Sequence, residues 1–148
     1  MEKLHLYLVR HCESLGNREN IFQGQLDLDI SATGEKQLAL LALRFRNIPI
    51  DAVYSSPLKR AYKTAEAVDL YHSLPIIKLP ELMEVDVGAL SGMKLDKAFA
   101  DYPVFAEKWQ NSPQNCIFPE GETTAEVYDR AKKALARVKA CLLYTSPS

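Results

Sequence analysis

Three short apolar runs are spread along the first 80 residues of the chain. The first, residues 4–9, is rich in strand-forming side chains and ends at an Arg-His pair, so we expect a buried strand there. Residues 51–55 and 75–79 have the same character and predict two further strands. Residues 13–30 show no sustained period, which is typical of a long functional loop.

Apolar residues at helical spacing and candidate helix caps occupy most of the remaining sequence. Ser31 is a candidate N-cap, and Ser56 followed by Pro57 is a candidate cap and first residue of a second helix. Thr123 and Glu126 have the spacing of a capping box. The expected helices are residues 31–46, residues 57–71, short pieces within residues 94–110, and a last helix from residue 123.

Strands that alternate with helices predict an α/β fold, a three-layer α/β/α sandwich with a mainly parallel sheet. The length of 148 residues is that of one domain with a real core. In such sheets the functional site lies at the carboxyl ends of the strands. We therefore expect His11 and residues 55–57 to lie near that site.

Composition narrows the function classes. Apolar residues make up 47% and charged residues 25%, and the formal net charge is −1, which disfavours nucleic acid and membrane surfaces as partners. The three cysteines are irregularly spaced, which favours reduced thiols in a cytoplasmic protein. No metal-binding motif, apolar run of about 20 residues or signal-peptide pattern is present, so we expect no metal, cofactor or membrane span.

The Arg10-His11 pair is the first element of candidate chemistry. A neutral imidazole can attack phosphorus, and an adjacent guanidinium both disfavours the imidazolium and contacts phosphoryl oxygens. Taken alone, the pair is better explained as a polar strand end.

Two later segments add to this chemistry. Arg60 falls in the first turn of the second expected helix, where the helix dipole and free N–H groups favour an anion, although a solvated arginine is an equal alternative. Glu84 lies in an acidic loop and could donate a proton, with Asp86 as its rival and a solvated loop acid as the alternative. The segment 120–123 could belong to the same site or simply cap the last helix.

Together these motifs resemble the histidine phosphatase superfamily, whose fold is phosphoglycerate mutase-like. The resemblance covers residues 3 to about 140, and the small alpha-ribazole and broad-specificity phosphatases are similar in style. The matching segments are Arg10-His11-Cys12-Glu13-Ser14 with Asn17, then Gln23-Gly24, Ser55-Ser56-Pro57-Leu58 with Arg60-Ala61, Leu82-x-Glu84-x-x-x-Gly88 and Gly121-Glu122-Thr123.

The resemblance implies a role for each matching residue. His11 would be the phosphorylated nucleophile, Arg10 and Arg60 would bind the phosphoryl group, and Glu84 would be the proton donor. Hydrogen bonds to phosphate or substrate would come from Asn17, Ser14, Gln23 and Gly24. The family needs no metal and no cofactor.

The sequence departs from the family pattern in two places. Cys12 stands where glycine is usual, and its side chain either narrows the pocket or is simply tolerated. The second histidine that the resemblance implies, on a strand after the last helix, does not follow residue 140. Residues 141–148 instead resemble translated adaptor sequence, so we expect a domain over residues 1–140 that lacks its C-terminal strand or strands, a non-native tail over residues 141–148 and little steady-state activity.

Three functions therefore stay open. A metal-independent phosphatase acting on a small phosphorylated metabolite is favoured by the compact spacing of about 30 residues between Gly88 and Glu120. A phosphoglycerate mutase is the alternative within the family, and a non-catalytic phosphate-binding fragment is the alternative outside it. The sequence identifies neither the substrate nor the oligomeric state.

Overall fold

The computed structural model of the protein describes residues 3–144. Its elements in chain order are α1 (Leu15–Arg18), α2 (Ala32–Phe45), β1 (Val53–Ser55), α3 (Lys59–Asp69), β2 (Ile76–Lys78), the 3-10 turns η1 (Pro80–Leu82) and η2 (Gly88–Leu90), α4 (Leu95–Asp101), α5 (Pro103–Asn111), η3 (Pro113–Asn115) and α6 (Thr124–Tyr144). The predicted tail over residues 141–148 begins inside α6, and residues 145–148 lie outside the described residues.

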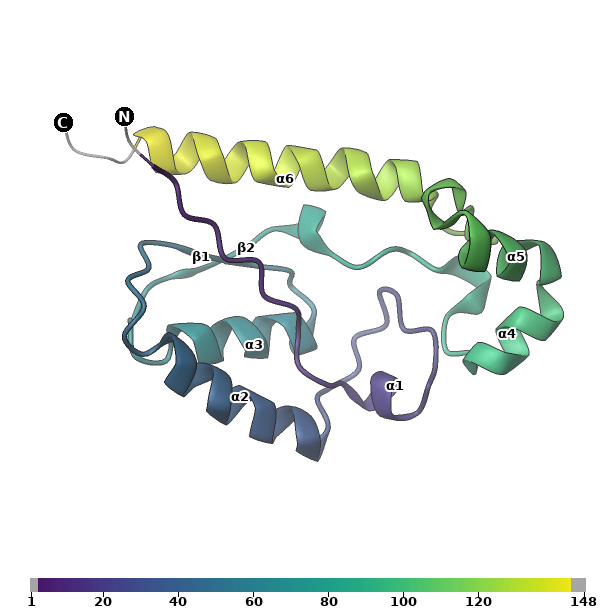
Figure 1. Ribbon diagram of the computed structural model, residues 1–148, viewed down its shortest axis with the longest axis horizontal. Coiled ribbons are helices and arrows are strands. Elements are labelled where there is room, and N and C mark those ends of the chain that lie inside the picture. Colours follow the sequence, from purple (N-terminus) through teal and green to yellow (C-terminus); the bar gives the residue numbers. More distant parts are fainter. Residues whose placement is uncertain (1–2, 145–148) are drawn as a thin grey trace.

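The strands form the middle of three layers (Figure 1). β1 and β2 pair in parallel, with Val53 opposite Ile76 and Ser55 opposite Lys78. The helix that connects them, α3, packs with α2 on one face, and α6 crosses the other face. The predicted α/β fold with parallel strands is confirmed, and both strands are shorter than their apolar runs.

Two of the three predicted helix starts are confirmed. The Ser31 hydroxyl accepts a hydrogen bond from the Gly34 amide at 3.0 Å, as an N-cap does. Thr123 and Glu126 form the expected capping box, with side-chain to amide distances of 2.9 and 3.1 Å. The predicted Ser56 cap is wrong, because the Ser56 hydroxyl accepts the amide of Leu58 within the preceding turn and the helix begins only after Leu58.

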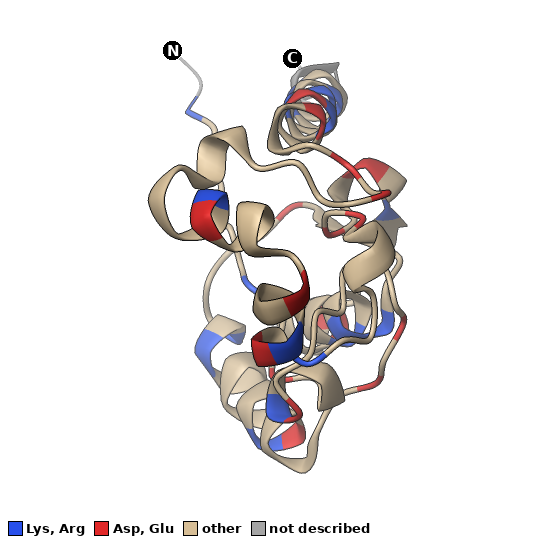
Figure 2. Cartoon of the chain, turned by 90° about the vertical axis from the view of Figure 1, so that its right-hand side faces the viewer, with Lys and Arg blue, Asp and Glu red and all other residues tan. Residues whose placement is uncertain are grey.

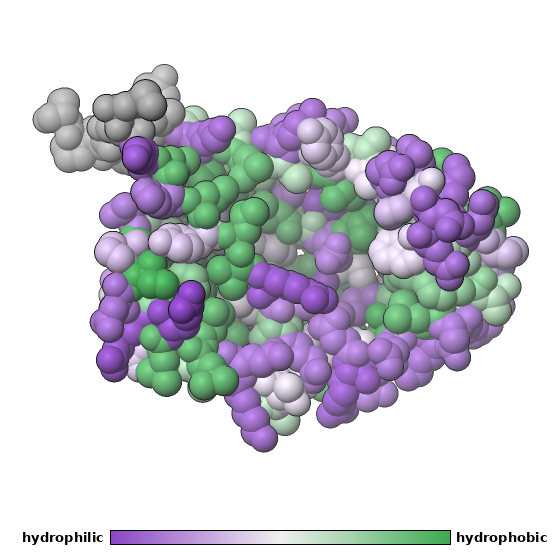
Figure 3. Space-filling view, viewed as in Figure 1, coloured by the Kyte–Doolittle hydropathy of each residue, from purple (hydrophilic) through white to green (hydrophobic). Residues whose placement is uncertain are grey.

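The predicted strand over residues 4–9 is also wrong. The segment is extended across the face that Figure 3 shows, but no neighbouring strand pairs with it among the residues that the structure describes. Its side chains are largely exposed, and Leu8 reaches 83%. One contact, between the rings of Tyr7 and Phe45 at 5.7 Å, joins it to α2. An apolar pattern records strand propensity but cannot supply the partner whose hydrogen bonds define a strand.

The buried side chains form two clusters. The larger surrounds Phe22 and Leu90 and is closed by α4 and α5, and the rings of Phe105 and Phe118 are tilted by 51° with their centroids 5.0 Å apart. The smaller lies beneath α6, where Leu79 meets Ala134 and Val138. Acidic and basic residues are interspersed along the chain in Figure 2, in agreement with the small net charge. None of the helices within residues 3–144 is long and apolar enough to cross a membrane.

Candidate active site

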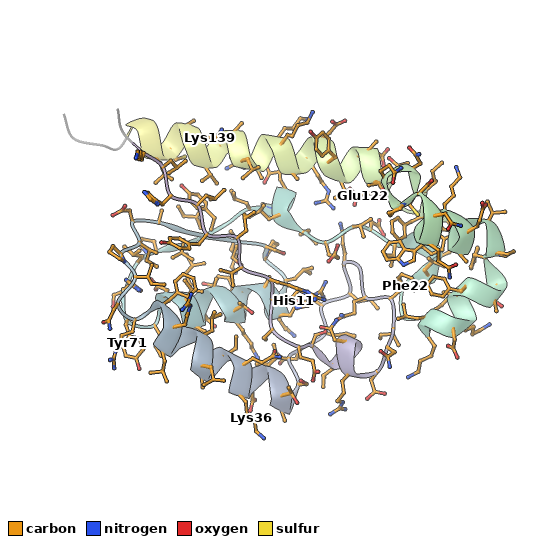
Figure 4. All side chains as sticks on the ribbon, viewed as in Figure 1. His11, Phe22, Lys36, Tyr71, Glu122 and Lys139 are labelled. Atoms are coloured by element: carbon orange, nitrogen blue, oxygen red, sulfur yellow. The ribbon has the colours of Figure 1, made fainter. Side chains whose placement is uncertain are left out.

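His11 lies at the end of the N-terminal segment, near the middle of the molecule (Figure 4). Its Nδ1 is 2.6 Å from the carbonyl oxygen of Cys12. A carbonyl only accepts hydrogen bonds, so Nδ1 carries the proton and the neutral ring keeps a lone pair on Nε2. The geometry therefore leaves Nε2 as the ring nitrogen with an available lone pair.

The segment that carries His11 is attached to α3. The amide of Cys12 donates to the Thr64 hydroxyl at 3.0 Å, and that hydroxyl donates to the carbonyl of Arg60 at 2.7 Å. Cys12 is buried, and its backbone does not adopt the left-handed conformation that would require glycine. The departure from the family glycine is thus accommodated by the local backbone.

Two open cavities meet at His11. One, here called the Arg10 cavity, has a volume of about 450 Å³ and is also lined by Asn17 and Thr64. The other, called the Arg60 cavity, has a volume of about 250 Å³ and is also lined by Glu84. His11 is therefore placed between the two predicted phosphate-binding arginines, with the predicted proton donor on the Arg60 side.

Arg60 is buried to 2% exposure at the start of α3. Its guanidinium donates to the carbonyls of Gly24 at 2.7 Å and Leu26 at 2.9 Å. Burial lowers the pKa of Arg60, whereas the charges of Glu84 and Asp27 raise it. Because three of its five N–H donors are not used by these two carbonyls, the buried cation can still bind an anion.

The surroundings of His11 favour its neutral form. Burial lowers the pKa of His11 below its ordinary value, and the positive charges of Arg60 and Arg10 lower it further. The hydrogen bond to Cys12 and the charge of Glu84 act in the opposite direction but do not reverse the shift. Near neutral pH a larger fraction of the molecules consequently has a neutral His11 ring, the form that can act as a nucleophile.

Glu84 lies on the loop between η1 and η2, which lines the Arg60 cavity. Its Oε1 accepts the amide of Val85 at 3.0 Å, and its carbonyl accepts the side-chain amide of Gln25 at 3.2 Å. The rival acid, Asp86, instead accepts the amide of Gly88 at 2.9 Å and does not line this cavity. Of the two acids, the structure brings Glu84 to His11.

The other predicted substrate residues are placed differently. Asn17 lines the Arg10 cavity, and its Oδ1 also accepts the amide of Ser14 at 3.0 Å. The fully buried Ser14 hydroxyl donates to Gln23 Oε1 at 2.6 Å, and neither residue lines a cavity. Gly24, with φ of +50°, presents its carbonyl to Arg60. These contacts hold the residues around His11 and Arg60 in place.

The family comparison matches residues 6–141 to the model of the histidine phosphatase superfamily, branch 1. The chain belongs to the histidine phosphatase superfamily. It is 40% identical over 134 residues to "Phosphoserine phosphatase 1" of Hydrogenobacter thermophilus, covering 90% of this chain and 64% of that protein. It is 33% identical to the "Probable phosphoglycerate mutase GpmB" of Erwinia tasmaniensis, covering 94% of this chain and 63% of that protein.

Solved structures of the superfamily share the fold. The alpha-ribazole phosphatase from Shigella flexneri superposes with a TM-score of 0.81 at 25% identity, covering 90% of this chain and 66% of that one. This chain thus spans a little under two thirds of the length of the proteins that it matches.

Sequence reasoning missed one residue of this superfamily member's site, Arg130. Its side chain projects from α6 into the lining of the Arg60 cavity, beside Val127 and Ala131. The available signal was its position, because an arginine stands within the helical face that those apolar residues define. Of the histidines, neither His5 nor His72 lines either cavity, and His72 Nε2 instead lies 2.8 Å from the carbonyl oxygen of Phe45.

Proposed function

We propose that the protein hydrolyses phosphomonoesters through a phosphohistidine at His11. One observation carries this proposal: a histidine with its lone pair on Nε2 lies between two arginines, and a carboxylic acid lines the same cavity. Membership of the superfamily and relatives named as phosphatases support it.

The chemistry has two steps. His11 Nε2 attacks phosphorus, the bond to the ester oxygen breaks, and Glu84 protonates that leaving oxygen. Water, deprotonated by the resulting Glu84 carboxylate, then attacks the phosphohistidine and releases inorganic phosphate. Arg10 and Arg60 stabilise the charge on the phosphoryl oxygens in both steps. In this proposal no step needs a metal ion.

We also propose a substrate class and a location. The cavity sizes and the relatives named for phosphoserine and alpha-ribazole phosphate support a small phosphorylated metabolite. The reduced thiols of Cys12 and Cys116 support a cytoplasmic protein.

Phosphorylation of His11 is the measurement that tests this function. The purified protein is mixed with p-nitrophenyl phosphate and quenched, and acid-labile phosphate on the protein is measured by mass spectrometry. We expect one phosphoryl group per chain. In His11→Ala the amount of protein-bound phosphate should fall by a factor of about 10³ or more, because the nucleophile is removed. Glu84→Gln should slow phosphorylation by a serine-like alkyl phosphate by about 10²-fold.

His72→Ala is the matched control, because His72 lies outside both cavities. It should be phosphorylated at the wild-type rate. An unsubstituted protein that binds phosphate but never becomes phosphorylated would identify a binding fragment instead. Slow release of phosphate from a phosphorylated chain would agree with the low steady-state activity expected from the sequence.

A mutase is the second candidate, because the chain is also similar to a protein named as a phosphoglycerate mutase. The two functions differ in the acceptor of the phosphoryl group. When the phosphorylated protein is mixed with 2-phosphoglycerate or 3-phosphoglycerate, a mutase transfers the group to the metabolite, whereas a phosphatase releases it to water at an unchanged rate.

A further inference from the structure

Arg130, a side chain of α6, donates hydrogen bonds to main-chain carbonyls of the loop that carries Glu84. We propose that Arg130, paired with Glu122, is a positioning residue that sets the place of the Glu84 carboxyl opposite His11. The inference rests on the proposed function, since it concerns the proton donor of that reaction.

All five N–H donors of Arg130 are used within the protein. Its Nε and one Nη2 hydrogen bind the two carboxylate oxygens of Glu122, both at 2.8 Å. The remaining three hydrogens are donated to main-chain carbonyls of the loop, those of Glu81 at 3.0 Å, Met83 at 2.5 Å and Glu84 at 3.0 Å. A guanidinium with no donor left cannot bind a phosphoryl group as well. Arg130 therefore acts on the loop and not directly on substrate.

Glu122 fixes the other end of the same loop. Its Oε2 accepts the amide of Asp86 at 2.8 Å, and its own amide donates to the carbonyl of Asp86 at 2.9 Å. The hydrogen bond from Arg130 lowers the pKa of Glu122, and the same bond raises the pKa of Arg130. The pair thus remains ionised near neutral pH, and its charges cancel close to the cavity. The last helix is capped by Thr123 and Glu126, so capping does not account for Glu122.

Two glycines allow the loop to lie against the start of α6. Gly88 has φ of +52°, and a Cβ at this position would collide with the carbonyl of Pro119. A Cβ at Gly121 would collide with the carbonyl of Asp86. Close backbone approach of this kind is what glycine permits. The motifs Gly88 and Gly121-Glu122 are therefore parts of one joint between the loop and the helix.

The position of the Glu84 carboxyl depends on this joint. Glu84 is exposed, and the hydrogen bond that its carboxyl accepts comes from the amide of the next residue, Val85. The side chain therefore moves with its own backbone, which Arg130 holds through the Glu84 carbonyl. Misplacing a catalytic group by about 1 Å can cost about 10²-fold in rate.

Arg137 offers a matched control on the same helix. It also contacts the loop, through a hydrogen bond of 2.8 Å to Glu81 Oε1, but it donates to the side chain and its own side chain is 56% exposed. If any cation from α6 were sufficient, replacing Arg137 would have the same effect as replacing Arg130.

The test compares two esters with leaving groups of different basicity. A misplaced proton donor harms a poor leaving group, such as the alkoxide of phosphoserine, far more than p-nitrophenolate, which leaves without protonation. We measure the second-order rate constant of His11 phosphorylation for both esters in Arg130→Met, Arg130→Lys and Arg137→Met. Hydrogen exchange of residues 83–86 is measured in the same proteins.

For Arg130→Met we expect phosphorylation by phosphoserine to fall by about 30-fold or more and phosphorylation by p-nitrophenyl phosphate by less than about threefold, with faster exchange at residues 83–86. Arg130→Lys should recover part of the loss, and Arg137→Met should match the unsubstituted protein. An equal loss for both esters would show a merely structural role and overturn the inference. Exchange in Arg130→Met no faster than in Arg137→Met would overturn it as well. Failure of the unsubstituted protein to be phosphorylated by either ester would instead refute the proposed function. Hydrogen exchange would then test only whether Arg130 holds the loop of Glu84.

Discussion

At the scale of single residues, the reactivity of the site depends on how His11 is surrounded. Its ring is held at Nδ1 by the Cys12 carbonyl, and the burial that lowers its pKa follows from packing against α3. Arg10 and Glu84 act on the ring with opposite charges from opposite cavities. The protonation state of the nucleophile is thus adjustable from two sides.

This arrangement predicts opposite shifts in the titration of His11. Removing a positive charge favours the imidazolium, so Arg10→Met should move the His11 midpoint to higher pH, and Glu84→Gln should move it to lower pH. The neutral ring is the nucleophile in the proposed reaction, so phosphorylation of the unsubstituted protein should rise with pH and level off below the pH expected for an unburied histidine. NMR titration of the ring measures the midpoints, with His72 resonances as the internal reference. Shifts of the same sign in both variants would contradict the electrostatic explanation.

At the scale of elements, the start of α6 joins helix capping to the site. Thr123 and Glu126 satisfy the first amides of the helix, and the adjacent Glu122 reaches back to the loop of Glu84. Fraying of the first turn of α6 would release the capping hydrogen bonds and the contact between Glu122 and the loop. The capping box consequently supports the loop of Glu84 through Glu122, the residue that directly precedes Thr123.

Loss of the cap should therefore be measurable as stability. Thr123→Ala removes the hydroxyl that accepts the Glu126 amide and should lower the free energy of unfolding by about 1 kcal/mol. Thr123→Ser keeps the hydroxyl and should remain near the wild-type value. Urea denaturation followed by far-UV circular dichroism compares the two variants. Equal stabilities would show that the capping hydrogen bonds do not stabilise α6.

At the scale of the whole molecule, burial is concentrated in two clusters and not along the N-terminal segment. Leu90 is completely buried beside Phe22, whereas Leu8 is 83% exposed. Leu8 belongs to the first apolar run of the sequence, whereas Leu90 lies outside the three apolar runs. Residues of the same type therefore contribute very different amounts to the free energy of unfolding.

Alanine substitution at these two leucines should show that difference. Leu90→Ala should reduce the free energy of unfolding by about 2–5 kcal/mol, because it removes buried methylene groups and leaves a cavity. Leu8→Ala should change it by less than about 0.5 kcal/mol, because the side chain is already in water. Denaturation can be followed by the fluorescence of Trp109, whose ring lies 6.0 Å from Phe22. A large loss in Leu8→Ala would show that the segment is buried in solution, as its apolar pattern predicts.

The sequence alone was sufficient for the family and for much of the local structure, with the Ser56 cap and the strand over residues 4–9 as the exceptions. The positions of α2 and α6 follow from period and capping residues, which act between neighbours along the chain. The parallel arrangement of β1 and β2 was predicted from the alternation of strands with helices. The choice of Glu84 over Asp86 rested on motif resemblance and stays a prediction, although Glu84 lines the Arg60 cavity and Asp86 does not.

Only the tertiary structure decided which distant groups meet. Within residues 3–144 it gives residues 4–9 no strand partner, because pairing depends on a neighbour that the local pattern does not encode. It joined Ser14 to Gln23 through a buried hydrogen bond, and neither residue lines the Arg10 cavity or the Arg60 cavity. It also brought Arg130 across 46 residues to the Glu84 carbonyl, a contact set by helix packing and invisible in the spacing of either motif.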